Sequence, residues 1–211
     1  MKAQSMKLTG VAVALLASLG AGCGEVSRNG RAPAMAVLSA LEAASGAEPD
    51  EFGTILNSDV ETMVEQEIDG EDVLVPTIYS DNGRVTMRLQ LRDPGIPGVP
   101  ASPSSMNEVT FTRYRVTYRR ADGRNTPGVD VPHPFDSAAT FTVPADGTVT
   151  AHFVLVRHTA KMEAPLGSLK TSSVIISTIA DVTFYGRDQA GNDVSVTGSI
   201  GVFFGNFGDP E

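Results

Sequence analysis

The chain has a single cysteine, Cys23, and no tryptophan among its 211 residues. One cysteine excludes a scaffold held together by internal disulfides. The sequence also lacks the Walker A, HExxH, GxSxG and CxxC patterns of nucleotide, zinc, serine-hydrolase and thiol-redox chemistry. A glycosidase needs two carboxylates facing a sugar cleft, and four tyrosines with no tryptophan leave few aromatic rings to line one. These absences predict a protein that is not an enzyme and needs no cofactor.

Positive charge is also scarce: the chain has 16 basic and 25 acidic residues, which gives a net charge of −9. Nucleic-acid binders need a basic surface to meet phosphate, so this balance argues against that class of partner. Hydrophobic residues make up 41% of the chain, which is near the usual fraction for globular domains and excludes wholesale disorder.

The longest uncharged apolar run lies near the N-terminus, from Leu8 to Ala21 after Lys2 and Lys7. At roughly 14 residues it is shorter than the ~20 needed to span a membrane, and it fits the core of a secretory signal. One interpretation of this run is a plain secretory signal followed by an incidental cysteine.

The run ends in Leu19-Gly20-Ala21-Gly22-Cys23. This resembles a bacterial lipoprotein signal, in which small residues precede a cysteine that is lipidated and becomes the first residue of the mature protein. It departs from the usual pattern by placing Gly20, not leucine, three positions before the cysteine. The resemblance implies that residues 1–22 are removed and that Cys23 carries acyl chains such as palmitate. Because Gly24 and Glu25 follow, and not the aspartate of inner-membrane retention, it favours the cell outer membrane.

The mature chain is predicted to have a short tether and one domain. Residues 23–32 have the composition of a flexible tether, and residues 33–211 show no second linker. Residues 33–47 fit either a helix, by propensity, or a first strand, by the all-β context that follows. We favour the strand.

Most of the remaining chain alternates with a period of two, which is typical of antiparallel strands with one buried face. Residues 84–92 alternate cleanly, whereas the apolar phase slips within 107–120 and predicts a β-bulge near Thr112-Arg113. Between them, residues 93–103 contain four prolines and two glycines, so we expect a long surface loop. Asp69-Gly70 and Asp146-Gly147 predict hairpins joining 60–68 to 73–78 and 141–143 to 149–156.

These patterns predict an all-β fold, an Ig-like Greek-key β-sandwich of about 7–9 strands. A closed lipocalin-like barrel is the alternative. The expected core residues are those on the apolar faces of the strands: Val85, Met87, Leu89, Leu91, Tyr114, Val116, Val182, Phe184, Val202 and Phe204.

The most specific pattern in the domain is Asp188-Gln-Ala-Gly-Asn192 between apolar-alternating segments 174–187 and 193–206. It resembles the last hairpin of bacterial Ig-like and fibronectin-III-like domains. This likeness implies a sandwich and no particular activity. Asp188, Asn192 and Asp193, with Asp181, are candidate Ca²⁺ ligands, but such residues also bond their own backbone in turns. We therefore expect no metal.

Two further groups of residues are candidate sites. Arg113, Arg115 and Arg119, with Arg120, form a basic stripe that either binds an anion or only solvates the sheet and meets nearby carboxylates. His133, with the 93–106 loop and neighbouring carboxylates, is the alternative site of a hydrolase or of a metal- or carbohydrate-dependent binder. The acidic stretch 48–72 is expected to be a solvated edge.

Together these observations predict a non-enzymatic envelope lipoprotein, a structural or ligand-binding sandwich module held to the membrane by its lipid. The expected partners are the membrane, an envelope protein or a polysaccharide, and no nucleic acid. A further alternative is a subunit of an envelope assembly whose last strand is unpaired and adds to a partner's sheet.

Overall fold

The computed structural model of the chain describes residues 32–207. The predicted signal peptide, Cys23 and nearly all of the tether lie outside the described residues, as do residues 208–211. The buried side chains form one hydrophobic core.

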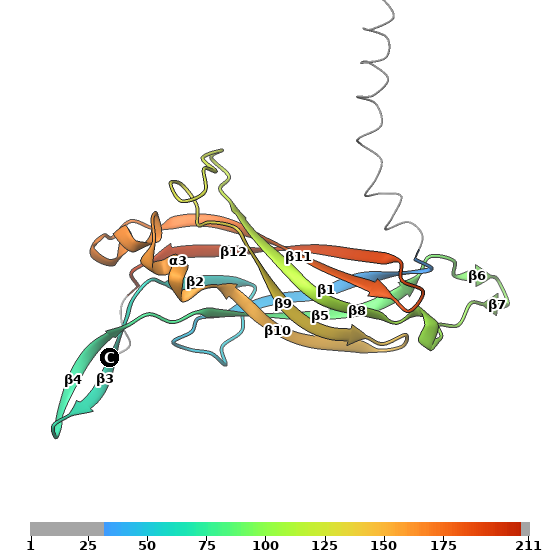
Figure 1. Cartoon of the computed structure of the whole chain (residues 1–211), viewed down its shortest axis with the longest axis horizontal. Helices are drawn as coiled ribbons and strands as arrows, with labels where there is room; N and C mark the ends of the chain where they lie inside the picture. Colours follow the sequence, from blue (N-terminus) through green and yellow to red (C-terminus); the bar gives the residue numbers. More distant parts are fainter. Residues whose placement is uncertain (1–31, 208–211) are drawn as a thin grey trace, which may run out of the picture.

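Two sheets enclose that core (Figure 1). The smaller has three strands in the order β1 (Ala34–Ala44), β5 (Asp81–Leu91) and β10 (Thr148–Val156). The larger has five, in the order β2 (Ile55–Asp59), β12 (Asp193–Gly205), β11 (Ile176–Asp188), β8 (Val109–Arg119) and β9 (Phe135–Val143). All pairs are antiparallel except β2 with β12. The predicted all-β sandwich is confirmed, and the closed barrel is wrong.

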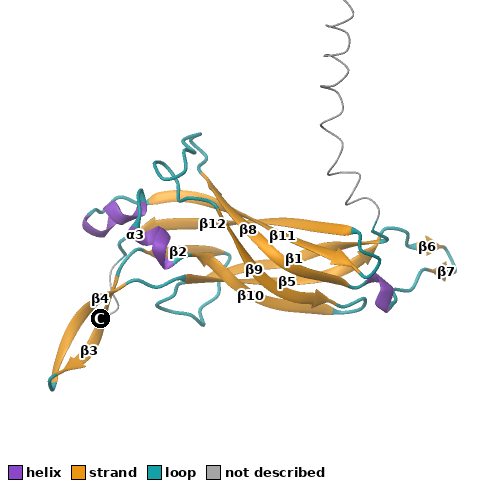
Figure 2. Cartoon of the chain, in the orientation of Figure 1, coloured by secondary structure: helices purple, strands orange, loops and turns teal. Residues whose placement is uncertain are grey.

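The remaining elements are short and lie outside the two sheets (Figure 2). β3 (Thr62–Ile68) and β4 (Glu71–Thr77) form a separate hairpin through Asp69 and Gly70, which both have positive φ. β6 (Gly95–Ile96), β7 (Val99–Pro100) and the 3₁₀ turn η1 (Ser105–Asn107) lie in the 93–106 loop. The helix α3 (His158–Met162) and the 3₁₀ segment η2 (Leu166–Thr171) connect β10 to β11.

Strand β1 confirms the strand interpretation of residues 33–47. It pairs with β5 over its whole length, and the register shifts near Ser39. Ala and Glu favour helix locally, but pairing with β5 lets β1 bury Ala34, Ala43 and Ala44 against the core, and this tertiary gain outweighs the weak propensity.

The slip in the apolar phase of β8 is a bulge, as predicted. The register with β9 breaks between Phe111 and Arg113, and the register with β11 breaks at the same level. Because the bulge inserts one extra residue, Phe111 and Tyr114 both point into the core and are almost completely buried.

The terminal hairpin forms in the predicted register. Strands β11 and β12 pair from Ile176 opposite Phe204 to Arg187 opposite Asp193. The expectation of an unpaired last strand is wrong, since β12 lies between β11 and β2. A period of two shows which side chains face the core, but it does not show how many neighbours a strand has.

Eight of the ten expected core residues are buried. Leu89 and Leu91 are only half-buried, because β10 pairs with β5 no further than Arg88 and the end of β5 lacks a neighbour on that side. Aromatic rings from the two sheets pack against one another in the core. The hydroxyls of Tyr114 and Tyr118 on β8 donate hydrogen bonds to the carbonyls of Val154 and Leu155 on β10.

The Asp146-Gly147 turn does not make a hairpin. It carries the chain from β9 in the five-stranded sheet to β10 in the three-stranded sheet. A local turn pattern predicts that the chain reverses, but the hydrogen-bonding partners of the flanking strands depend on the rest of the fold.

Candidate functional site

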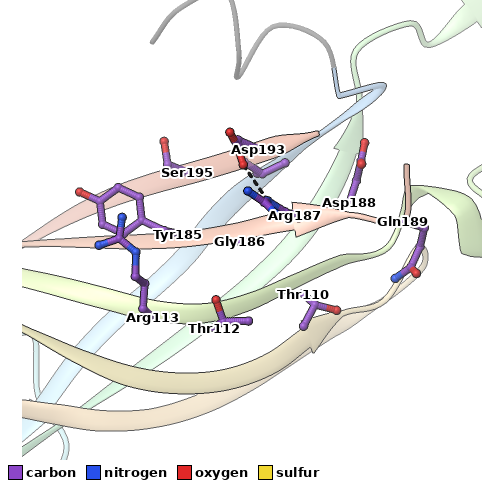
Figure 3. A pocket seen from close by; sticks show the side chains of 11 residues that line it. Thr110, Thr112, Arg113, Tyr185, Gly186, Arg187, Asp188, Gln189, Asp193 and Ser195 are labelled. Atoms are coloured by element: carbon purple, nitrogen blue, oxygen red, sulfur yellow. Dashed lines mark hydrogen bonds and ion pairs between the residues drawn. The ribbon is translucent and has the colours of Figure 1, made fainter. Parts of the chain in front are cut away.

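A groove of about 710 Å³ lies on the outer face of the five-stranded sheet. It runs over β8, β11 and β12 near the β11–β12 turn, and Figure 3 shows the side chains around it. Its lining is polar and bears hydroxyls, guanidinium groups and one aromatic ring, from Thr110, Thr112, Arg113, Tyr185, Gly186, Arg187, Asp188, Gln189, Asp193, Val194 and Ser195.

The strand period places Tyr185, Arg187 and Ser195 on the outer face, because Phe184, next to Tyr185 on β11, fills the core. Asp188 and Val194 border the groove from buried positions. The β8 bulge lies in the groove and turns Thr112 and Arg113 toward the same outer face. At Gly186, a Cβ would collide with the carbonyl oxygen of Thr110. Only glycine therefore allows β8 and β11 to pair closely here.

Arg113 is the central charged group of the groove. Its guanidinium carbon lies 4.0 Å from the centre of the Tyr185 ring (Figure 3), a cation–π arrangement that fixes the side chain. Its Nη1 lies 3.2 Å from Oδ1 of Asp136. The Arg113 side chain keeps 55% of its surface exposed, so a ligand in the groove has access to it.

Arg187 and Asp193 face one another across the β11–β12 pair, with 2.9 Å between Arg187 Nε and Asp193 Oδ1. The Arg187 side chain is 72% exposed, and an ion pair this open to water contributes little to stability. The guanidinium of Arg187 can therefore exchange Asp193 for a bound anion at small cost.

The structure does not gather the predicted Arg stripe into one site. Arg115 lies beside Arg113 and pairs with Asp136 at 2.8 Å. Arg119 lies six residues along β8 from Arg113, about 20 Å away at ~3.3 Å per residue. It pairs with Asp181 at 2.7 Å, and this hydrogen bond raises the pKa of Arg119. Of the three, Arg113 alone lines the groove.

The candidate calcium residues Asp188, Asn192 and Asp193 do not converge on a common point. Asp188 Oδ1 accepts the backbone N–H groups of Ala190 and Asn192, at 3.0 and 2.8 Å, and Oδ2 accepts the Asn192 side-chain amide at 2.8 Å. Asp193 faces Arg187. Within residues 32–207, no group of three or more His, Cys, Asp or Glu side chains could hold a metal ion.

We therefore expect Asp188→Ala to lower the free energy of unfolding by about 1–2 kcal/mol, because it removes the acceptor of three hydrogen bonds that close the turn. The melting temperature of the parent should be the same with and without EGTA. A fall in the parent's melting temperature on adding EGTA, absent from Asp188→Ala, would contradict this interpretation of the loop.

His133 and the 93–106 loop lie at opposite ends of the sandwich. The loop leads into the first residue of β8, Val109, whereas His133 follows the last, Arg119. An 11-residue strand separates the two by about 35 Å. The imidazole of His133 lies directly against the backbone of Gly128. The two parts of the alternative site are therefore not brought together.

Sequence reasoning missed a buried ion pair between Asp81 and Lys161. Asp81 Oδ1 lies 2.7 Å from Lys161 Nζ, and the two side chains are 0% and 1% exposed. Ser58 donates to Oδ2 at 2.6 Å, and the backbone N–H of Gly46 donates to Oδ1 at 3.0 Å. Burial raises the pKa of Asp81. The partners are 80 residues apart, so no local pattern could have revealed the pair.

Among the described residues there is no helix with the length and apolar character to cross a membrane. No protein-family model, no curated protein and no solved structure matches this chain.

Proposed function

We propose that the protein is a non-enzymatic lipoprotein of the outer membrane whose sandwich binds an anionic glycan in the groove on its five-stranded sheet. The observation that carries this proposal is the Arg113 guanidinium held over Tyr185 in an open, hydroxyl-lined groove. Lipid attachment at Cys23, which lies outside the described residues, is supported by the signal-like N-terminus.

The groove suits an acidic sugar polymer. Threonine, serine and glutamine side chains offer hydrogen bonds to sugar hydroxyls, and Tyr185 offers part of a ring for an apolar sugar face. Arg113 and Arg187 offer charge-assisted hydrogen bonds to carboxylate or phosphate groups. A ligand that bridges both arginines also competes with their exposed partners Asp136 and Asp193, which favours a multivalent anion over a single charge.

The groove also lies at the end of the sandwich where the chain enters. The Arg92 backbone N–H donates to the Pro33 carbonyl at 3.0 Å, and Arg92 Nε donates to the Ala32 carbonyl at 3.1 Å. Asp188, in the groove, pairs with Val109 at this same end. A tether from Cys23 to Ala32 would therefore hold the groove close to the membrane surface, where envelope polysaccharide begins.

Polygalacturonate and dextran, one acidic and one neutral, test this proposal by calorimetric titration. We expect the parent to bind polygalacturonate, and the double variant Arg113→Gln/Arg187→Gln to bind at least ~10-fold more weakly, the loss expected for ~1.4 kcal/mol of charge-assisted hydrogen bonding. The control is Arg124→Gln, whose partner Asp122 lies in the 120–134 loop, outside the groove. Equal affinities for the parent and the groove variant would contradict the proposal.

A second candidate function is a subunit of an envelope assembly, and the β3–β4 hairpin favours it. The hairpin projects beyond the sheets at the end opposite β6 and β7 (Figure 1). Ile68, Val73 and Leu74 on it are 47%, 41% and 63% exposed, which is typical of a contact surface. Five carboxylates and no basic residue accompany them between 62 and 77: Glu65, Glu67, Asp69, Glu71 and Asp72. This surface matches a basic partner protein, which cross-linking from the hairpin in the native envelope would capture.

A further inference from the structure

Most of the loop between β5 and β8 is uncharged in a protein whose whole chain is 19% charged, and its charges lie only at its ends, at Arg92, Asp93 and Glu108. Residues 94–107 contain no Asp, Glu, Lys, Arg or His. Protein surfaces usually have about 25–35% charged residues, so an exposed segment of this length without any is unusual.

The structure makes this segment an ordered tip that presents aliphatic side chains. Ile96 pairs with Val99 across β6 and β7, so the two side chains share one face. Gly98, with φ 88, turns the chain between them, and the Ala101 N–H donates to the Pro94 carbonyl at 3.0 Å. Ile96, Val99 and Met106 are 68%, 67% and 60% exposed. Ile96 and Val99 thus form an exposed aliphatic pair on a closed turn, and Met106, on η1 of the same loop, is a third exposed apolar side chain.

The tip lies where the anchor would be. β6 and β7 extend beyond the sheets next to the start of β1 (Figure 1), and Arg92, just before the loop, binds Pro33 and Ala32. Ala32 follows Cys23 by nine residues, which reach at most about 30 Å when fully extended. A lipid on Cys23 would thus hold this end of the sandwich, and not the acidic β3–β4 hairpin, within reach of the bilayer.

We propose that the 94–107 loop rests on the bilayer, with Ile96, Val99 and Met106 entering the lipid headgroup region beside the lipid anchor. This inference rests on the lipid attachment proposed above. Moving aliphatic side chains out of water is favourable in free energy. Because the segment has no charged side chain, no charge has to be desolvated when it enters the headgroup region. Contact at this loop would stand the sandwich on end, with the β3–β4 hairpin facing away from the membrane.

The test uses the full mature lipidated chain on vesicles of phosphatidylethanolamine and phosphatidylglycerol. Because the one native cysteine would carry the lipid, a cysteine introduced by Ile96→Cys is the single free thiol and takes the environment-sensitive fluorophore NBD. The matched control is Leu74→Cys on β4, where the native side chain is 63% exposed compared with 68% for Ile96. We expect NBD at 96 to emit at shorter wavelength on vesicles and to be quenched by doxyl-labelled lipid, and NBD at 74 to do neither.

A protein that floats with the vesicles while NBD at 96 still reports water would overturn this inference and leave the lipid anchor standing. A protein that does not float would overturn both. A second variant, Ile96→Ser/Val99→Ser, should abolish the NBD shift measured from Met106→Cys, and persistence of that shift would contradict the roles assigned to the two aliphatic side chains. All these positions are exposed, so the fold should survive, which circular dichroism checks.

Discussion

Replacing Lys161 with methionine is expected to lower the free energy of unfolding by about 3–5 kcal/mol at neutral pH, because it leaves a buried carboxylate without its countercharge. Asp81 is 0% exposed and keeps only Ser58 and Gly46 as donors once the ammonium is gone. Chemical denaturation of parent and variant measures the difference.

The loss should depend on pH in a definite direction. Burial raises the pKa of Asp81 in the folded protein above its ordinary value of 3.8, and removing Lys161 removes the largest opposing influence. The folded variant therefore binds a proton more tightly than the unfolded chain does, so its stability falls as the pH rises from about 4 through the folded pKa of Asp81. The penalty should be smallest near pH 4 and largest at neutral pH.

The double variant Asp81→Asn/Lys161→Met is the control for this prediction. It removes both charges, while the new amide oxygen still accepts from Gly46 and the amide nitrogen can donate to Ser58. We expect its stability at neutral pH to return to within about 1–2 kcal/mol of the parent, since replacing both partners of a buried pair is often nearly neutral. A double variant as unstable as Lys161→Met alone would show that the lost packing of Lys161, and not its charge, explains the effect.

Phe184→Ala is expected to lower the free energy of unfolding by about 3–5 kcal/mol, because it opens a cavity at the centre of the core. Phe184 is completely buried. Its ring centre lies 5.2 Å from that of Phe153 on β10 in the opposite sheet, and 5.9 Å from that of Tyr114 on β8. The same measurement on Arg88→Ala, on the exposed face of β5, should show a loss under about 0.5 kcal/mol. Similar losses from the two variants would contradict the assignment of faces.

Local patterns were enough to predict most of the long strands and their buried faces, although they missed β2 (Ile55–Asp59) and the first part of β9 (Phe135–Val143). The period of two identified Val85 and Met87 on β5 and Val182 and Phe184 on β11, and all four are buried. The bulge could be predicted as well, because one extra residue in β8 leaves a visible break in the apolar phase. Each of these features depends on neighbours in sequence, where the residue period carries the information.

Features that depend on distant segments could not be predicted in the same way. Leu89 looks like Met87 in sequence and is less buried because β10 begins opposite Arg88. The Asp146-Gly147 turn joins strands that belong to different sheets. Arg113 lines the groove and Arg119 does not, because the groove also needs Tyr185 and Gly186 on β11. The residues of β11 lie 60 to 80 positions along the chain from their partners on β8.

The mass of the mature N-terminus decides whether this sandwich is held to a membrane by a lipid on Cys23. We expect a chain that begins at Cys23 and is heavier than residues 23–211 by the mass of its acyl chains. The Cys23→Ser variant should lose its partition into membranes. An unmodified soluble product, or one that begins at another residue, would contradict attachment through Cys23.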